Sequence, residues 1–395
     1  MRLANFSNEP LVVPKVTVLG TAEEISEPLI DSINAGCKSD ADSPTKPRRG
    51  KENEVLYNIL LKGNLHHLSH EDRQLIKPIL LNYAHLFHDE ETDDFPGTNV
   101  IEHEILVGDA QPIRRSQYRT PYVLLGEMKS QIEKMLGKGI SRQSNSPWYA
   151  PAILVPKKSP DGRAKFRFCV DFRALNAVTK FDPFPLTVFE ETTSSLFGSK
   201  YVSVPDCYTG FWQVAIKEDH KERTGFTVPF GHYEFNRLPF GLSNSPTNFQ
   251  RLMDIVLKNL VVTECFVFLD DIIFFSESAE QLALRLENVL QRFDQVNLQL
   301  HPGKCVFAQP KVQYLGYVLS KDGVSASADK VRAVKNYPIP KNAKDARAFL
   351  DLCSFYRKLV PKFAEIANPL TMLARKGQKF TWGPSQQEAV EELKK

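Results

Sequence analysis

The spacing of apolar residues predicts four α-helices in the chain. Apolar side chains recur three and four positions apart over 69–87, 120–137, 245–257 and 278–293, which places them on one face of a helix. The first and last of these segments open on a Ser followed three residues later by an Asp or a Gln, the spacing of a capping box. Pro78 lies inside the first segment, so we expect a kink or a division there.

Short apolar runs bounded by turn residues predict strands between these helices. The runs at 150–156 and 166–172 flank a Pro-Asp-Gly turn signal and predict a hairpin with a basic tip. Further strands are expected at 200–204, 224–229 and 232–238, and as a tight hairpin within 266–275. Hairpins that alternate with helices indicate an α+β fold, in which an antiparallel sheet packs on helices.

The composition is that of an ordinary globular protein. Of the 395 residues, 42% are hydrophobic and 25% charged, which excludes a collagen-like, coiled-coil or largely disordered chain. The six cysteines form no C-x-x-C pair, no apolar run has the length of a membrane span, and the first residues lack a signal-peptide core. We therefore expect an intracellular protein, cytoplasmic or particle-associated and not secreted, with no membrane partner.

The net charge of +3 conceals a segregation of charge along the chain. Residues 1–110 contain 10 Lys and Arg against 19 Asp and Glu, whereas 111–173 contain 13 against 4 and 330–376 contain 11 against 3. Two basic blocks favour a polyanion that is bound at two places. Charge alone leaves a solvated charged surface open as the alternative.

The stretch FVFLDDIIFF, residues 266–275, carries the strongest chemical signal. Four apolar residues on each side should be buried in a sheet, so Asp270 and Asp271 hold two like charges near a low-dielectric wall. Divalent cations usually compensate such a pair, and carboxylate oxygens suit Mg²⁺. A turn at Asp-Asp also lacks the Asn or Gly that a positive φ favours. A solvent-facing acidic turn is the alternative that the pair alone leaves open.

Asp206 is the candidate for a third carboxylate. It follows the apolar strand expected at 200–204 and precedes Gly210, Phe211 and Trp212. Two metal ions that are bridged by carboxylates would activate an attacking hydroxyl and stabilise a leaving oxygen. The three acids therefore favour nucleotidyl transfer on the surface of a sheet.

Seven segments, in order over about residues 100–395, resemble the reverse transcriptases of Gypsy-class LTR retrotransposons and, more distantly, those of retroviruses. They read SPWYAPAILVPKK, FRFCVDFRALN, PDCYTGFWQV, RTGFTVPFGHYEFNRLPFGLSNSPTNFQ, FVFLDDIIFF, VQYLGYVLSKDG and ARAFLDLCSFYRKLVPKF. The resemblance implies an RNA-directed DNA polymerase, a nucleotidyltransferase with the fingers, palm and thumb of a right hand. Its partners would be an RNA or DNA template with a primer, and dNTPs. By the same resemblance, Asp206, Asp270 and Asp271 are the catalytic carboxylates that hold two Mg²⁺ ions, with Mn²⁺ as an alternative metal.

The resemblance also implies substrate-binding residues. Phe211 corresponds to the aromatic residue that crowds the sugar 2′ position and selects deoxynucleotides, which argues against an RNA-producing polymerase on the same fold. Arg167 and Lys158 correspond to basic residues of the fingers that contact the triphosphate. Phe240 corresponds to a residue that lines the nucleotide pocket. An ordinary strand-edge arginine and a core phenylalanine are the alternatives for Arg167 and Phe240.

The resemblance further implies a division of the chain into four segments. Residues 1–110 would be a leader that combines a post-protease linker with a helical segment. Residues 111–318 would form the fingers and palm, 319–376 the thumb, and 377–395 the start of a connector towards RNase H. Because no protease, RNase H or integrase motif occurs in the sequence, we expect a slice of a Pol polyprotein, with those modules as further partners.

Three residues depart from the family's pattern. Pro205 stands where an aliphatic residue usually precedes the first catalytic Asp, Phe268 replaces the usual Tyr before the Asp pair, and Asp351 replaces a common Gly. Proline removes a ladder hydrogen bond and is poorly tolerated in a central strand. The alternative function is therefore a catalytically inactive or domesticated retroelement relic that keeps the fold and nucleic-acid binding.

Overall fold

A computed structural model of the chain describes residues 65–88, 97–157, 164–185, 198–375 and 378–395. By its contacts the chain divides into two units, 1–48 and 49–395, and all of the described residues belong to the second unit. The first part of the expected leader therefore lies outside the described residues.

Three of the four predicted helices begin where the sequence predicts, whereas the helix expected from Thr120 begins at Leu125, after a 3₁₀ turn at Tyr122–Leu124. Ser69 Oγ accepts a hydrogen bond from Asp72 N at 3.1 Å, and Ser278 Oγ accepts one from Gln281 N at 3.3 Å, so the two capped helix starts are confirmed. Within the described residues, no helix is both long and apolar enough to cross a membrane. The helices are α3 (His70–Asn82), α4 (Leu125–Gly137), α5 (Arg173–Val178), α7 (Ser245–Val256), α8 (Ala279–Gln295), α9 (Ala328–Lys335), α10 (Ala343–Ser354), α11 (Phe363–Leu373) and α12 (Pro384–Lys394).

Helix α3 is shorter than the sequence predicts. It ends at Asn82 and a 3₁₀ turn at Ala84–Leu86 follows, so the expected end at Phe87 is wrong. Pro78 lies inside the helix and does not divide it. The carbonyl of Leu86 instead accepts a hydrogen bond from Leu300 N at 2.7 Å. This long-range pairing takes the backbone out of the helix, and the local apolar spacing carries no sign of it.

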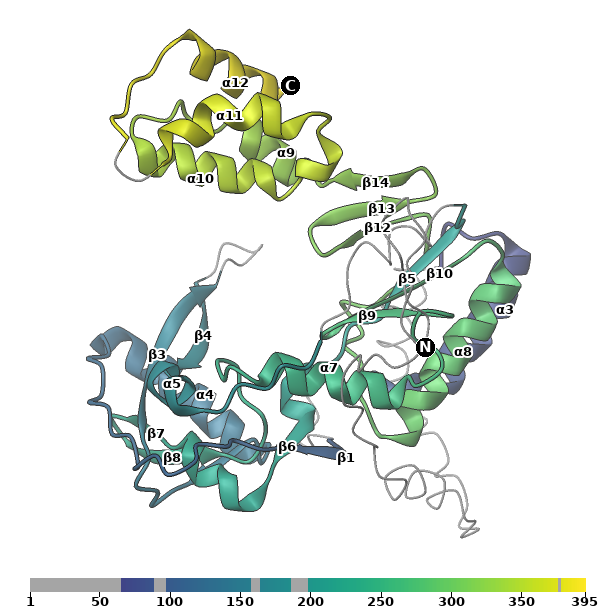
Figure 1. The fold of residues 1–395 in the computed structure, drawn as a ribbon. Coiled ribbons are helices and arrows are strands. Elements are labelled where there is room, and N and C mark those ends of the chain that lie inside the picture. Colours follow the sequence, from purple (N-terminus) through teal and green to yellow (C-terminus); the bar gives the residue numbers. More distant parts are fainter. Residues whose placement is uncertain (1–64, 89–96, 158–163, 186–197, 376–377) are drawn as a thin grey trace, which may run out of the picture. The chain divides into compact units, whose positions relative to one another are not determined.

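One sheet of four antiparallel strands, in the order β11-β5-β10-β9, carries the candidate site (Figure 1). Helix α8 packs against β10, α3 packs against α8, and α7 packs against β9. The predicted α+β fold, with an antiparallel sheet on helices, is therefore confirmed. The strands are β5 (Tyr201–Val204), β9 (Phe266–Phe268), β10 (Asp271–Ser276) and β11 (Val306–Gln309).

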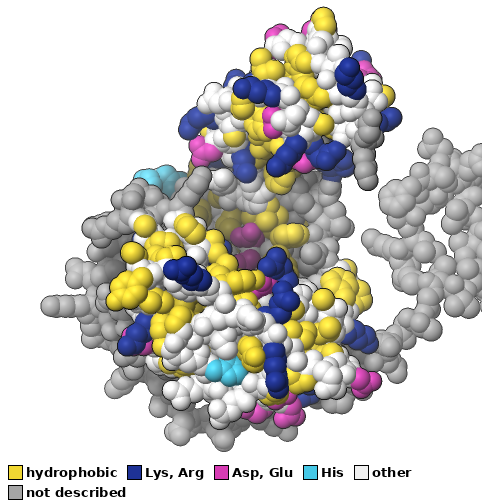
Figure 2. Space-filling model, turned by 90° about the vertical axis from the view of Figure 1, so that its left-hand side faces the viewer, with side chains coloured by type: hydrophobic (Ala, Val, Ile, Leu, Met, Phe, Trp, Pro, Cys, Tyr) yellow, Lys and Arg dark blue, Asp and Glu magenta, His cyan; other side chains and the backbone are white. Residues whose placement is uncertain are grey.

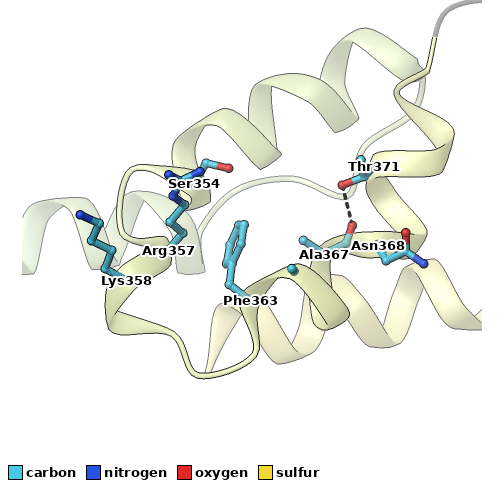
Figure 3. Close-up of a pocket in the computed structure, with 8 residues that line it drawn as sticks. Ser354, Arg357, Lys358, Phe363, Ala367, Asn368 and Thr371 are labelled. Carbon is cyan, nitrogen blue, oxygen red and sulfur yellow. Dashed lines mark hydrogen bonds between the residues drawn. The ribbon is translucent and has the colours of Figure 1, made fainter. Parts of the chain in front are cut away.

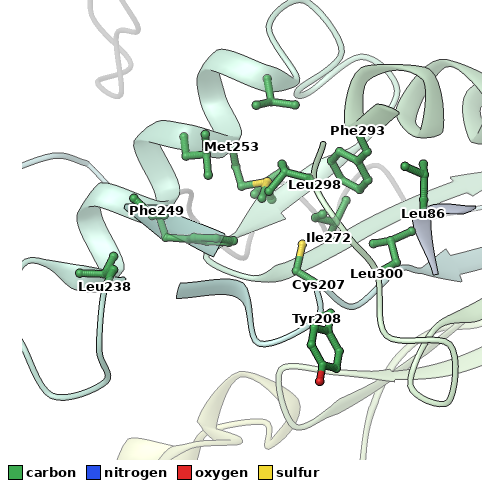
Figure 4. Packing of buried hydrophobic residues seen from close by; sticks show 14 of the residues in the cluster. Leu86, Cys207, Tyr208, Leu238, Phe249, Met253, Ile272, Phe293, Leu298 and Leu300 are labelled. Carbon is green, nitrogen blue, oxygen red and sulfur yellow. The ribbon is translucent and has the colours of Figure 1, made fainter. Parts of the chain in front are cut away.

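Strand β10 is apolar almost throughout because both of its faces are buried. Ile272 and Phe274 belong to the main core, which also contains residues of α7 and α8. Ile273 and Phe275 point to a second cluster, which they share with the three-stranded sheet that follows β11. Figure 4 shows Ile272 in the main core together with Phe293 of α8. Burial on both faces gives a continuous apolar run instead of an alternating pattern.

A second sheet has five strands in the order β2-β8-β7-β3-β4, and β3 runs parallel to β7. Both hairpins expected in this part of the chain are confirmed, because β3 pairs with β4 and β7 pairs with β8, each antiparallel. The basic tip at 158–163 lies outside the described residues. The strands are β2 (Ser141–Gln143), β3 (Ala150–Lys157), β4 (Lys165–Val170), β7 (Phe226–Val228) and β8 (Gly231–Phe235).

The described part of the expected leader packs with the later elements. Strand β1 (Thr98–His103) pairs in parallel with β6 (Val214–Ile216), and α3 contributes Ile76 and Leu80 to the main core. These residues are therefore part of the same packed body as the sheet that carries the site.

The C-terminal residues form a small sheet and a helical cluster. The antiparallel strands are β12 (Lys311–Tyr314), β13 (Tyr317–Ser320) and β14 (Gly323–Ala326), so the expected border at 318/319 falls inside β13. Helices α10, α11 and α12 share a core that contains Phe349, Leu370 and Val390. The segment expected as the start of a connector thus packs on the helices that precede it.

Candidate active site

Strand pairing places Asp206 and Asp271 opposite each other. Strands β5 and β10 pair with Ser203 opposite Phe274, and the same register continues to a bridge between Asp206 and Asp271. Directly opposed residues of an antiparallel pair have Cβ atoms roughly 4.5–5.5 Å apart. Two of the three predicted carboxylates therefore meet just beyond the end of β5.

Asp270 lies in the tight turn between β9 and β10. Phe268 pairs with Asp271, so Leu269 and Asp270 form the two-residue loop, and Leu269 adopts the positive φ of 60°. The two residues of the turn are thus Leu269 and Asp270 rather than Asp270 and Asp271, and Asp271 belongs to the strand. A Cβ placed on Gly210 would lie 3.5 Å from Asp270 Cβ, which shows how closely the backbone after Asp206 approaches this turn.

Gln250 of α7 holds the turn through its side-chain amide. Its Oε1 accepts a hydrogen bond from Leu269 N at 2.8 Å, and its Nε2 donates to Asp254 Oδ1 at 2.9 Å. Gln250 is fully buried, so its amide ties the backbone next to Asp270 to the core, although Leu269 and Asp254 are themselves partly exposed. Gln250 was not predicted from the sequence. The available signal was a polar side chain directly after Phe249 in the helix expected over 245–257.

Pro205 does not displace Asp206 from the sheet. The buried proline stands between the end of β5 at Val204 and the bridge that joins Asp206 to Asp271. Because β5 lies between β11 and β10, the missing N–H removes a donor from a central strand. The register nevertheless continues past the proline.

The turn after α8 surrounds Asp206 with polar partners. His301 N donates to Asp206 O at 2.8 Å, and Asp206 N donates to Cys305 Sγ at 3.3 Å. Lys304 Nζ lies 3.4 Å from Asp206 Oδ1 and forms an ion pair with it. None of the three partners was predicted from the sequence, because they follow Asp206 at a long distance along the chain and no local pattern joins them.

Burial raises the pKa values of two of the carboxyl groups. The pKa of Asp271 is raised to about 6, first by burial and then by the charges of Asp270 and Asp206. Burial also raises the pKa of Asp206, although the charge of Lys304 acts in the opposite direction. A group of carboxylates that repel one another near a low-dielectric wall favours a cation beside it.

The donor set fits a hard divalent cation, although the side chains do not form a closed cage. Within the described residues, no three His, Cys, Asp or Glu side chains converge closely enough to hold a metal ion as they stand. Asp206, Asp270 and Asp271 supply the oxygen ligands that Mg²⁺ prefers. Burial raises the pKa of the Cys305 thiol to about 12 and that of Cys207 well above its ordinary value, so neither offers a thiolate.

Two of the predicted substrate-binding residues come together beside the carboxylates. The rings of Phe211 and Phe240 have centroids 5.2 Å apart, and Phe211 also contacts Phe249 of α7 at 5.6 Å. Phe240 is 48% exposed, so it is not a core residue. A Cβ on Gly210 would lie 3.0 Å from Phe249 Cζ, so the turn that carries Phe211 fits closely against α7.

Arg167, the described one of the two predicted basic residues, lies on another sheet. Arg167 is exposed on β4, opposite Val155, and belongs to the five-stranded sheet rather than to the sheet that carries the aspartates. Lys158 lies outside the described residues. On the face drawn in Figure 2, Lys and Arg side chains gather beside a group of acidic side chains.

A basic cavity of about 600 Å³ lies among the C-terminal helices. It is lined by residues of α10, α11 and the segment between them, and Figure 3 shows Arg357 and Lys358 on one side of the Phe363 ring. Polar groups line the other side, where Thr371 Oγ1 donates to Ala367 O at 3.0 Å. Such a combination of cations and a partly apolar wall suits an anionic group on a larger ligand.

The comparisons with known proteins identify the class of protein that this fold and these carboxylates define. Residues 155–319 match the reverse transcriptase (RNA-dependent DNA polymerase) family, so the chain contains a reverse transcriptase domain.

The relatives specify the kind of reverse transcriptase. The Retrovirus-related Pol polyprotein from transposon 297 of Drosophila melanogaster is 36% identical over 333 residues, which are 84% of this chain and 31% of that protein. The corresponding polyprotein from transposon opus of the same species is 40% identical over 276 residues, 70% of this chain and 28% of that protein. The chain therefore belongs to the reverse transcriptases of LTR retrotransposons, and it spans less than a third of the length of these relatives.

Solved structures show the same fold. The foamy viral protease-reverse transcriptase in complex with an RNA/DNA hybrid has a TM-score of 0.74 and 24% identity, covering 89% of this chain and 47% of that one. A form of the same enzyme in complex with double-stranded DNA has a TM-score of 0.77 at 24% identity, covering 89% of this chain and 61% of that one.

Proposed function

We propose that this chain is an RNA-directed DNA polymerase that extends a primer with dNTPs by a two-metal mechanism. The observation that carries the proposal is the bridge that opposes Asp206 to Asp271, next to Asp270 in the adjoining turn. These three carboxylates would hold two Mg²⁺ ions, or Mn²⁺. When bound, the metal ions would stabilise the charge on the attacking and leaving oxygens.

The neighbouring residues fix the three carboxylates in place. Gln250 anchors the turn of Asp270, and the main-chain register anchors Asp271. Lys304 pairs with the Asp206 carboxylate and places a positive charge beside the site. Because these contacts are set by the fold, the main chain that carries the carboxylates is in place before substrate arrives, and only the side chains have to turn towards the metal ions.

We further propose that the aromatic pair beside the aspartates shapes the nucleotide pocket. Phe211 would limit the space at the sugar 2′ position, and the exposed face of Phe240 would line the pocket. The contact between their rings and the fit of Gly210 against Phe249 support a fixed wall. Arg167 and Lys158 would contact the triphosphate from the β3–β4 hairpin.

The template and primer would lie along the two basic blocks. We propose that 111–318 form the fingers and palm, 319–376 the thumb, 377–395 the start of a connector and 1–110 a leader. The foamy viral structures contain an RNA/DNA hybrid or double-stranded DNA, which supports nucleic acid as the partner. Arg357 and Lys358 at the C-terminal cavity would take backbone phosphates.

Primer extension tests the proposal. The full chain is incubated with an RNA template, a DNA primer, dNTPs and Mg²⁺ or Mn²⁺, and we expect extension that Asp270→Asn abolishes. Asp329→Asn, a change of an exposed acid on α9, is the matched control and should leave extension unchanged. Absence of synthesis by the wild type with either metal would refute the proposed activity.

The alternative function is an inactive relic that keeps the fold and binds nucleic acid. The position of Pro205 directly after the central strand β5 and directly before Asp206 is the observation that favours it. The test is Pro205→Leu, which restores the N–H. If the wild type is inactive and this variant extends primers, the relic interpretation holds, whereas normal extension by the wild type excludes it.

A further inference from the structure

The segment His301–Cys305 holds the backbone of Asp206 on the side away from Asp271. Asp206 N donates to Cys305 Sγ at 3.3 Å, and Cys305 Sγ lies 3.6 Å from Asp206 O, within the range of an S–H donor. His301 N donates to the same carbonyl at 2.8 Å. One thiol thus contacts both polar groups of the Asp206 main chain.

These contacts lie where the regular ladder stops. Val204 pairs with Val306, and this is the last regular pair of β5 with β11. Successive residues of a strand direct their N–H groups to opposite neighbours, so the N–H that Pro205 lacks belongs to the β10 side, and Asp206 is the next residue whose N–H faces β11. Cys305 directly precedes Val306 and is only 4% exposed, and its side chain reaches the Asp206 N–H. A buried N–H needs a partner, and the thiol is the partner that the structure provides.

The thiol contact differs from the contact of Lys304. Lys304 approaches the carboxylate oxygen of Asp206 and is exposed, whereas Cys305 approaches only the main chain and is buried. Side-chain charge and main-chain position are therefore controlled by different residues of the same turn.

We propose that Cys305 is a positioning residue for the candidate polymerase site. Its thiol takes the place of a ladder partner where the regular β5–β11 pairing ends at Val204, and it sets the main chain of Asp206, so that the carboxylate faces Asp271. The inference rests on the proposed function in so far as Asp206 is a catalytic carboxylate. The alternative is that Cys305 only fills space in the core.

Three substitutions separate these roles. Cys305→Val keeps the volume and removes both hydrogen bonds, Cys305→Ala removes volume and bonds with less risk of a steric clash, and Cys305→Ser keeps a donor and an acceptor. The same changes at Cys353, a buried thiol in α10 away from the sheet, are the matched controls. Thermal melting and circular dichroism identify the variants that keep the fold.

The main readouts do not depend on synthesis. Hydrogen exchange of peptides that cover 203–209 should be faster in Cys305→Val and Cys305→Ala than in the wild type, and close to the wild type in Cys305→Ser. The Kd for Mn²⁺, measured by electron paramagnetic resonance, should rise about tenfold in Cys305→Val, as is typical when an outer partner of a metal ligand is lost. In primer extension, kcat should fall with little change in the KM for template and primer.

Two results would overturn the proposal. If Cys305→Val matches the wild type in exchange and Mn²⁺ binding, the thiol does not position Asp206. If Cys305→Ser fails as badly as Cys305→Val, the residue acts through packing. If the wild type itself shows no synthesis, the proposed polymerase activity fails, but exchange and Mn²⁺ binding still decide the role of Cys305.

Discussion

His103, at the end of β1, should make the fold sensitive to mild acid. The side chain is 2% exposed, and burial lowers its pKa to about 4. His220 acts in the same direction, whereas a contact with Asn248 and the charges of Asp182 and Glu104 act against it. Strand β6, the partner of β1, directly follows the turn that carries Phe211 in the chain. Loss of the β1–β6 pairing would therefore also disturb the candidate site.

The expected loss of stability follows from the two pKa values. In the unfolded chain His103 titrates near its ordinary pKa of about 6.5. Because the folded pKa is lower, the unfolded state binds the proton more readily, so stability is complete above about pH 6.5 and falls as the pH decreases towards 4. The full difference corresponds to about 3 kcal/mol, of which about 2 kcal/mol is lost between pH 7.5 and pH 5.0.

Chemical denaturation at these two pH values measures the effect. His103→Gln removes the titrating group, so the wild type should lose about 2 kcal/mol more free energy of unfolding than this variant on going to pH 5.0. The difference between the proteins cancels the contributions of the titrating groups that do not interact with His103. His66→Gln, a change of an exposed histidine, is the control and should follow the wild type. Equal losses in the wild type and His103→Gln would refute the reasoning.

Two further substitutions test the supports of the candidate site. Gln250→Ala leaves the partly buried N–H of Leu269 without its side-chain partner, which should cost about 1 kcal/mol of unfolding free energy and lower kcat in primer extension. An unchanged kcat would show that the turn of Asp270 is held by other contacts. Phe211→Ala should raise the kcat/KM for rNTPs relative to dNTPs, because the ring no longer fills the space at the sugar, whereas Phe363→Ala in the C-terminal cavity should leave that ratio unchanged. An unaltered ratio in Phe211→Ala would exclude the ring as the sugar-selecting wall.

Much of the fold could be predicted because its signals are local. The capping serines Ser69 and Ser278 bond to the N–H three residues ahead, and such a contact depends on a few neighbouring residues. The hairpins were predictable for the same reason, since each joins two adjacent runs. The end of α3 was not, because the partner of Leu86 is Leu300, and no window of local sequence contains both.

The candidate site was predictable in its residue types but not in its geometry. The run FVFLDDIIFF indicated two acids in a buried hairpin, but such a run does not show which residue takes the turn. Leu269 adopts the positive φ of the turn, and its N–H donates to the side chain of Gln250. Because the turn is made by Leu269 and Asp270, Asp271 belongs to the strand. Bonds between distant segments decided the register, and such bonds have no local signature.

Pro205 illustrates how far a local rule reaches. In the sequence it indicates a broken strand, because the only partners that a ladder rule considers are those of neighbouring strands. In the structure the residue after it is bonded from both sides, by the bridge to Asp271 and by the turn that contains Cys305. A proline removes one backbone N–H donor from a strand. The chain on either side keeps its register when other groups bond to the residue that follows the proline. Pro205 therefore shows which groups have to hold Asp206 in place, but it does not show that catalysis is lost. The primer-extension activities of the wild type and of Pro205→Leu decide that question.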